Sequence, residues 1–432
     1  MLKYLIQIWN SPDLRKKILF TLGIIILYRF IAHITVPGAN IQALQAVASK
    51  NELLELFSLL TGGNTENFSL VLMGISPYVN ASIILQLLTV IVPKLENLSK
   101  EGESGRRKIN SYTRWLTLPL AFLQSYGMII LLNSQAQIPI IENTTDPTVM
   151  LPIMLSISAG TILLVWLGEQ ISEKGIGNGI SVIIFASIVS SIPQMIGQGL
   201  FLAQGDESKL IPFTIITLLT VVLITIVILV TEAQRKIPIT YAGGGIKAKS
   251  DQASLPIRIN QAGMIPIIFA VALVSFPGVL GQFLVNAKTE WLRSLGESMT
   301  TLFQPNTVFY LIMYFLLVVA FTFFYVSITF NPVQVAENIQ KRGGYIPGIR
   351  PGTQTSEYLG QVSNRLTLFG AVFLGVIAGL PILIQFAFQS TGIGSVPLLI
   401  SGAGIIIIVG VVLELIRQIN AQLVMHDYKK FY

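Results

Sequence analysis

Residues 211–231 read IPFTIITLLTVVLITIVILVT, an apolar run without a single charged side chain. An α-helix rises about 1.5 Å per residue, so a run of this length crosses the roughly 30 Å hydrocarbon core of a bilayer. Nine similar runs lie at 18–36, 73–92, 114–132, 151–168, 179–197, 262–282, 308–330, 365–386 and 395–416. The sequence therefore predicts an all-α polytopic membrane protein with ten transmembrane helices.

The composition agrees with this prediction. Apolar residues make up 52% of the 432-residue chain and charged residues only 11%, far below the quarter that is typical of soluble domains. The chain has no cysteine, which excludes disulfides, thiolate metal sites and thiol nucleophiles, and its two histidines are far apart. We expect no metal, no cofactor and no enzymatic activity.

Basic residues predict the orientation. Of the 28 Lys and Arg residues, all but five fall in loops and termini on one side of the predicted membrane; the exceptions are Lys50, Lys209, Lys288 and Arg293 on the other side and Arg29 within the first span. Cytoplasmic loops carry the excess of Lys and Arg. The sequence therefore predicts a multi-pass membrane protein with both termini in the cytoplasm.

Three short segments differ from the spans. Leu53–Leu60 is apolar but too short to span, which favours an interfacial or re-entrant helix. Phe283–Phe303 has apolar residues at helical spacing, which predicts an amphipathic surface helix. The glycines of the GIGNG stretch at 175–179 follow no strand, so a tight turn is favoured over a phosphate-binding loop.

The spans hold almost no ionisable residues, and the chain has no P-loop motif. Apolar walls between basic loops fit a pore that does not select by charge and that is worked by a docking partner. A secondary carrier for a small solute and a scaffold for other membrane proteins remain as alternatives, although a carrier coupled to ions usually keeps buried charges.

Several longer motifs carry a family resemblance. They include GISPYVNASIILQLL at 74–88, EGESGRRKINSYTRWLT at 101–117, LPIRINQAGMIPIIFA at 255–270 and FNPVQVAENIQKRGGYIPGIRPGTQTSEYL at 330–359. In this order and at these spans, they resemble the SecY family, whose members are the central subunits of the general protein-conducting channel. The resemblance covers nearly the whole chain.

The resemblance implies two inverted five-helix halves, here 1–200 and 201–432, around a central pore. It implies a channel in the plasma (inner) membrane that passes unfolded polypeptides across it and releases transmembrane segments sideways into lipid through a lateral gate. The implied partners are SecE-type and SecG-type subunits, the SecA ATPase, the ribosome, an unfolded preprotein or signal peptide, and membrane lipid.

The family's narrow pore ring corresponds to Val79, Ile83, Ile180, Ile184, Ile268 and Ile407. Pairs four residues apart share one helix face, and branched apolar side chains can form a dry constriction. From the residues alone, ordinary helix packing or lipid contact explains each of them better, and only the register of the family motifs favours a pore ring.

The resemblance also assigns a gate, a plug and two docking loops. Gln86 and Asn260 match polar positions at the lateral gate, where simple helix adhesion is an equal alternative, and residues 53–66 match the plug. The docking loops correspond to 232–261 and 331–364, with Arg235, Lys247, Lys249 and Arg350 as candidate contacts. The tip at 242–255 is less basic than is usual in the family, which predicts weaker ribosome contact.

Overall fold

Each of the ten predicted spans coincides with a helix in the computed structural model, which describes residues 7–40, 68–135, 139–141, 146–205, 207–241, 254–285, 287, 289–304, 307–389 and 401–430. These helices are α2 (Pro12–Ala32), α5 (Ser76–Ile91), α7 (Glu103–Gln135), α8 (Pro147–Lys174), α9 (Gly179–Gly205), α10 (Glu207–Glu232), α11 (Ile265–Val285), α13 (Val308–Thr329), α15 (Thr353–Gln389) and α16 (Gly402–Lys430).

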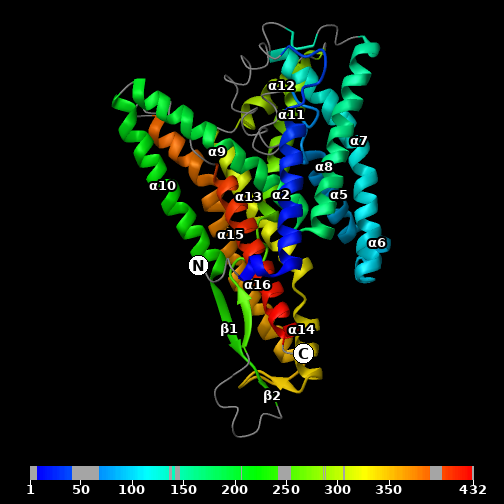
Figure 1. The fold of residues 1–432 in the computed structure, drawn as a ribbon, viewed down its shortest axis with the longest axis vertical. Coiled ribbons are helices and arrows are strands. Elements are labelled where there is room, and N and C mark those ends of the chain that lie inside the picture. Colours follow the sequence, from blue (N-terminus) through cyan, green and yellow to red (C-terminus); the bar gives the residue numbers. More distant parts are fainter. Residues whose placement is uncertain are drawn as a thin grey trace. The chain divides into compact units, whose positions relative to one another are not determined.

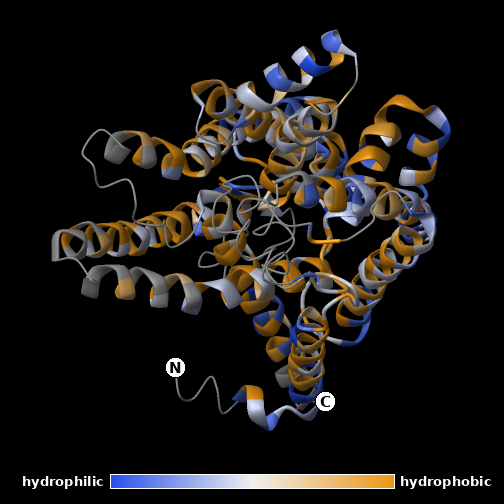
Figure 2. Cartoon of the chain, turned by 90° about the horizontal axis from the view of Figure 1, so that it is seen from above, coloured by the Kyte–Doolittle hydropathy of each residue, from blue (hydrophilic) through white to orange (hydrophobic). Residues whose placement is uncertain are grey.

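By length and composition, α8, α9, α10, α13, α15 and α16 can each cross a membrane, and α5 with the following α6 (Pro93–Lys100) makes a seventh candidate among the described residues. The pair is bent by 101°. The bend falls at Pro93, which has no backbone N–H to continue the hydrogen bonds of α5. Figure 2 shows hydrophobic colour along most of the long helices.

Local chemistry fixes where several helices begin. Asp146 caps α8, because its Oδ1 accepts a hydrogen bond from the backbone N–H of Thr148 at 3.0 Å. Asn331 does the same for α14 (Pro332–Lys341) through the N–H groups of Val333 and Gln334. A proline follows each cap, where its missing N–H leaves no helical bond unmade.

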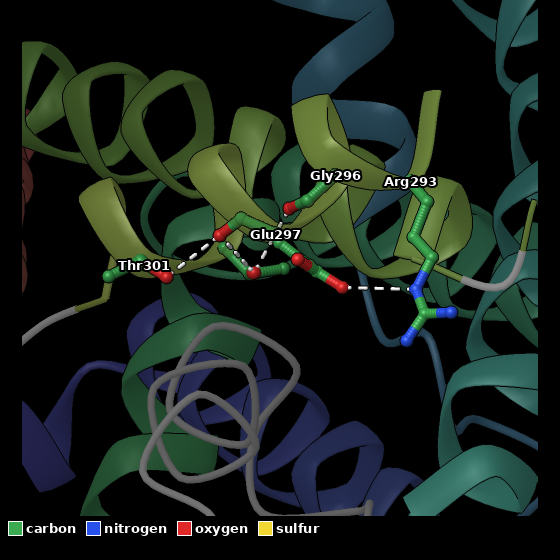
Figure 3. Close-up of polar contacts among 5 residues, drawn as sticks. Arg293, Gly296, Glu297 and Thr301 are labelled. Carbon is green, nitrogen blue, oxygen red and sulfur yellow. Dashed lines mark hydrogen bonds and ion pairs between the residues drawn. The ribbon is translucent and has the colours of Figure 1, made fainter. Parts of the chain in front are cut away.

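The predicted amphipathic helix is present as α12 (Glu290–Leu302). Figure 3 shows its polar side, where Arg293 Nε donates to Glu297 Oε1 at 3.1 Å and Thr301 Oγ1 donates to the Glu297 carbonyl at 2.7 Å. The helix packs on α11 through Gly296, where an added Cβ would lie 2.5 Å from the backbone N of Val285. This close approach requires a glycine.

Two short antiparallel sheets were not predicted. β1 (Gln234–Pro238) pairs with β3 (Ser254–Arg258), and β2 (Thr240–Tyr241) pairs with β4 (Gly344–Tyr345). All four strands lie within the predicted docking loops. The β2–β4 ladder therefore joins the segment after α10 to the segment after α14.

The chain forms two compact units. Unit 1 comprises residues 1–205, 275–307 and 411–432, and unit 2 comprises residues 206–274 and 308–410. The predicted inverted halves at 1–200 and 201–432 concern internal symmetry and stay a prediction.

In unit 1, a buried cluster that includes Phe68, Leu72, Ile129 and Ile157 holds α7 and α8 together. In unit 2, α13 lies along α15 (Figure 1), and an added Cβ at Gly375 of α15 would lie 2.6 Å from the Phe315 ring of α13. Small residues at such contacts let two membrane helices approach closely.

Candidate functional site

The predicted ring residues of unit 1 lie on α5 and α9. Ile83 and Ile184 are buried, with 6% and 7% of their surface exposed. Val79 and Ile180, one turn earlier on each helix, are half-buried. Each pair therefore occupies one face of its helix.

Packing against α8 already gives the side chain of Ile180 a structural role. An added Cβ at Gly168 of α8 would lie 2.8 Å from Cδ1 of Ile180, so this side chain lies directly over α8. Ile184 is the stronger ring candidate on α9.

The two ring candidates of unit 2, Ile268 on α11 and Ile407 on α16, are also buried. Near them the two helices approach each other, because an added Cβ at Gly410 of α16 would lie 3.5 Å from Cβ of Met264. Ile268 is one turn after Met264, and Ile407 is about one turn before Gly410. Because the ten predicted spans alternate in direction, we expect Ile268 and Ile407 to lie at a similar level on the two helices.

Both gate candidates have local hydrogen-bond partners. Gln86 is half-buried on α5, and its Nε2 donates to Ser82 Oγ at 3.3 Å. Asn260 is buried, and its Oδ1 accepts the N–H of Gly263 at 2.9 Å, which stabilises the turn before α11. These contacts give each residue a structural role, and the gating role stays a prediction.

Some sequence candidates lie outside the described residues. They are the plug segment 53–66 and the two lysines of the 242–253 tip, Lys247 and Lys249.

The two docking loops form one structural module in unit 2. A shared buried cluster contains Ile237 and Ile257 from the β1–β3 sheet, Ile339 of α14, Ile346, and Leu359 of α15. Together with the β2–β4 ladder, this cluster joins the described parts of the two loops. The sequence alone did not predict that they pack on each other.

Arg350 lies on an ordered turn of this module. The side chains of Ile346 and Ile349 pack on the shared cluster, and the Arg350 carbonyl accepts a hydrogen bond from Thr355 Oγ1 at 2.9 Å. Gly348 and Gly352 take φ values of +84° and +98°, which favour glycine. The turn fixes the backbone of Arg350 and leaves its side chain exposed.

Arg235 is the second described docking candidate. It lies on β1 opposite Ile257 of β3, with its side chain exposed. Further exposed basic side chains on the module are Lys236, Arg258, Lys341 and Arg342. Lys341 pairs with Glu337 at 3.4 Å. The described surface of the module is therefore rich in cations that suit phosphate or carboxylate partners.

The turn at 175–179 is confirmed, and it has a further structural role that the sequence did not predict. The N–H of Ile176 donates to Thr21 Oγ1 of α2 at 3.1 Å, and the N–H of Gly177 donates to Gln418 Oε1 of α16 at 2.8 Å. This turn therefore ties α2 and α16 together within unit 1. The glycines of the GIGNG stretch were the feature of the sequence that could have indicated this close packing.

Among the described residues, His, Asp and Glu form no group of three that could hold a metal ion.

Comparisons with known proteins agree with this arrangement. A SecY family model matches residues 69–416. The Protein translocase subunit SecY of Aquifex aeolicus is 39% identical, and the alignment covers 100% of this chain and 99% of that protein.

Solved structures show the same fold at lower identity. A protein-conducting channel structure has a TM-score of 0.69 at 22% identity, covering 94% of this chain and 92% of the other. Sec61 from the canine ribosome–channel complex of the endoplasmic reticulum has a TM-score of 0.65 at 22% identity, with the same coverage.

Proposed function

This chain belongs to the SecY family, and we propose that it forms a protein-conducting channel worked by partners that dock on its cytoplasmic loops. The full-length similarity to a protein translocase subunit carries this conclusion. The channel passes unfolded polypeptides and releases transmembrane segments sideways into lipid. We expect no catalytic step of its own, so the work of transport comes from a partner.

The constriction is proposed to consist of Val79, Ile83, Ile180, Ile184, Ile268 and Ile407. Support comes from the burial or half-burial of all six on α5, α9, α11 and α16. A ring of branched apolar side chains stays dry and opposes ion flow, yet it accepts a chain of any sequence because it makes no specific contacts. The plug at 53–66 would close the same path, and Gln86 and Asn260 would lie beside the lateral exit.

The unit 2 module is the proposed docking surface for a SecA-type ATPase and for the ribosome. The structurally similar Sec61 comes from a ribosome–channel complex, which supports a ribosomal partner. Arg350 is the main contact that we propose on this surface, and support comes from its held backbone and exposed side chain. Lys247 and Lys249 would add only weak phosphate attraction.

We propose a plasma-membrane location, as the resemblance to the SecY family implies, and cytoplasmic termini, because the basic residues concentrate on their side. A SecE-type helix and a SecG-type subunit would complete the complex.

Transport can be tested by reconstitution. The full chain, a SecE-type subunit and a SecA-type ATPase are placed in lipid vesicles with an unfolded preprotein outside. We expect protease-protected preprotein that depends on ATP, and vesicles given a non-hydrolysable ATP analogue are the control. An absence of protection, with the ATPase shown to bind, would overturn the proposal. Uptake of a small solute in place of preprotein would support a carrier.

A further inference from the structure

A pocket of about 390 Å³ opens between α7 and α8, entirely within unit 1. Its lining includes Arg114, Trp115 and Leu118 from α7 and Ile162, Trp166 and Glu169 from α8. The proposed channel does not use this pocket. Its walls are mostly apolar, but they contain one cation and one anion.

The two charged residues form an ion pair at one edge of the pocket. Arg114 Nη1 lies 3.1 Å from Glu169 Oε2, and the side chains are 52% and 28% exposed. A guanidinium has five N–H donors and a carboxylate has about four acceptor positions, so one contact leaves most of this capacity available to a ligand.

The positions of the lining residues predict that the pocket lies at the depth of lipid headgroups. Arg114 and Glu169 stand at the ends of the spans predicted at 114–132 and 151–168, on the side with the basic loops. Trp115 and Trp166 are 75% and 51% exposed, and exposed tryptophans concentrate at the membrane–water boundary. Leu118 and Ile162, further along the spans, are exposed apolar side chains.

We propose that this pocket binds a zwitterionic phospholipid, phosphatidylethanolamine, through its phosphate on Arg114 and its ammonium group on Glu169. The two opposite charges of the headgroup complement the two opposite charges of the pocket. Trp115 and Trp166 offer aromatic faces to the amine, and Leu118 and Ile162 contact the first acyl carbons. An anionic lipid without an amine would leave Glu169 unmatched, close to its phosphate.

Headgroup selectivity tests the proposal directly. The full chain with its SecE-type partner is extracted in detergent, mixed with equal amounts of phosphatidylethanolamine, phosphatidylcholine and phosphatidylglycerol, and weighed by native mass spectrometry. We expect retention of phosphatidylethanolamine about tenfold above phosphatidylglycerol, as befits one charge-assisted contact. Phosphatidylcholine should fall between them, because its quaternary amine cannot donate a hydrogen bond to Glu169.

Matched variants locate the site. Arg114→Gln and Glu169→Gln should each abolish the preference. The control pair is Arg107→Gln and Glu103→Gln, because these residues form a 2.6 Å ion pair on the same helix with about four-fifths of each side chain exposed, and they do not line the pocket. Selective retention should persist in the controls.

Equal retention of all three lipids by the unchanged chain would overturn the proposal, as would an equal loss in the control variants. A thermal unfolding curve for each variant separates lost binding from lost folding. Where a glutamine variant unfolds early, Arg114→Lys, which keeps the charge, must restore both the melting curve and the preference. The experiment measures lipid retention and not preprotein transport. The proposed lipid site can therefore be disproved without disproving the proposed channel, and the reverse also holds.

Discussion

At Arg350, the backbone of the loop is held in place while the side chain is exposed. One buried and one partly buried isoleucine, two glycines with positive φ and one side-chain hydrogen bond fix the turn around it. None of these groups constrains the guanidinium itself. The family resemblance named Arg350 as a candidate docking contact, and its side chain is exposed in the structure. Whether a partner uses it stays a prediction.

Charge reversal at this position tests the docking role. Arg350→Glu should lower ATPase-driven preprotein uptake about tenfold or more, because a charge-assisted contact becomes a repulsion. Its stability should stay within about 0.5 kcal/mol, as is usual for exposed sites. Arg342→Glu, also exposed on the module, is the control. Equal losses of uptake in the two variants would mean that docking depends on the total charge of the module and would contradict a specific role for Arg350.

The constriction can be tested at Ile184. Ile184→Gly should increase ion conductance through reconstituted vesicles, because it removes the side chain of a proposed barrier residue. Ile183→Gly is the matched control, since Ile183 is the neighbouring position on α9, faces another direction and is 1% exposed. Both changes weaken packing, so a similar leak from each would indicate general loosening of the helix and would contradict the assignment.

Asp146 gives a pH-dependent element outside the spans. Hydrogen bonds to its carboxylate from the backbone N–H and then the hydroxyl of Thr148 hold the pKa of Asp146 below its ordinary value. A lowered pKa means that the cap stabilises α8 above the ordinary pKa of aspartate and is lost as the pH falls through the lowered one.

We expect faster amide hydrogen exchange at the start of α8 once the pH falls below the lowered pKa, relative to the intrinsic rates at each pH. Asp146→Asn keeps a capping oxygen but cannot titrate, so its exchange should lose this dependence. An unchanged pH profile in that variant would show that another group is responsible.

At the scale of elements, the long apolar runs predicted the helices well. Burial in lipid forces every backbone polar group to find a partner within its own helix, so length and apolar character suffice. The same information could not predict β2 and β4. They have two residues each and are separated by about a hundred residues in sequence, so only the folded module reveals their pairing. The sequence motif likewise could not predict that Ile180 packs on Gly168.

The glycine turn between α8 and α9 is a sensitive junction. An added Cβ at Gly179 would overlap the carbonyl oxygen of Gly168. Gly179→Ala should therefore destabilise the chain by about 1–3 kcal/mol, the usual range for overpacking. Gly197→Ala, on the same helix with nothing within 4 Å, should be neutral or stabilising by up to about 1 kcal/mol. Denaturant unfolding measures both, and equal effects would contradict the close approach.

At the scale of the whole molecule, charged and apolar residues occupy different parts of the chain. The spans carry few charges, whereas the basic residues concentrate in loops and termini on one side. This separation predicted membrane orientation without any structure. The family resemblance added the identity of the channel, because apolar walls alone do not distinguish a pore from helix packing. The two compact units each contain part of α11 and part of α16. The apolar runs of the sequence could not indicate this division.

The most direct test of the channel is a crosslink to a chain in transit. The protein has no cysteine, so a single cysteine at Ile83 or Ile407 is unique. A translocating preprotein with one cysteine is stalled in the reconstituted complex, and the mixture is oxidised. The account predicts a disulfide from either position, and none from a cysteine at Leu229, an exposed position on α10. Crosslinking at Leu229 with none at Ile83 or Ile407 would contradict a path through the proposed constriction.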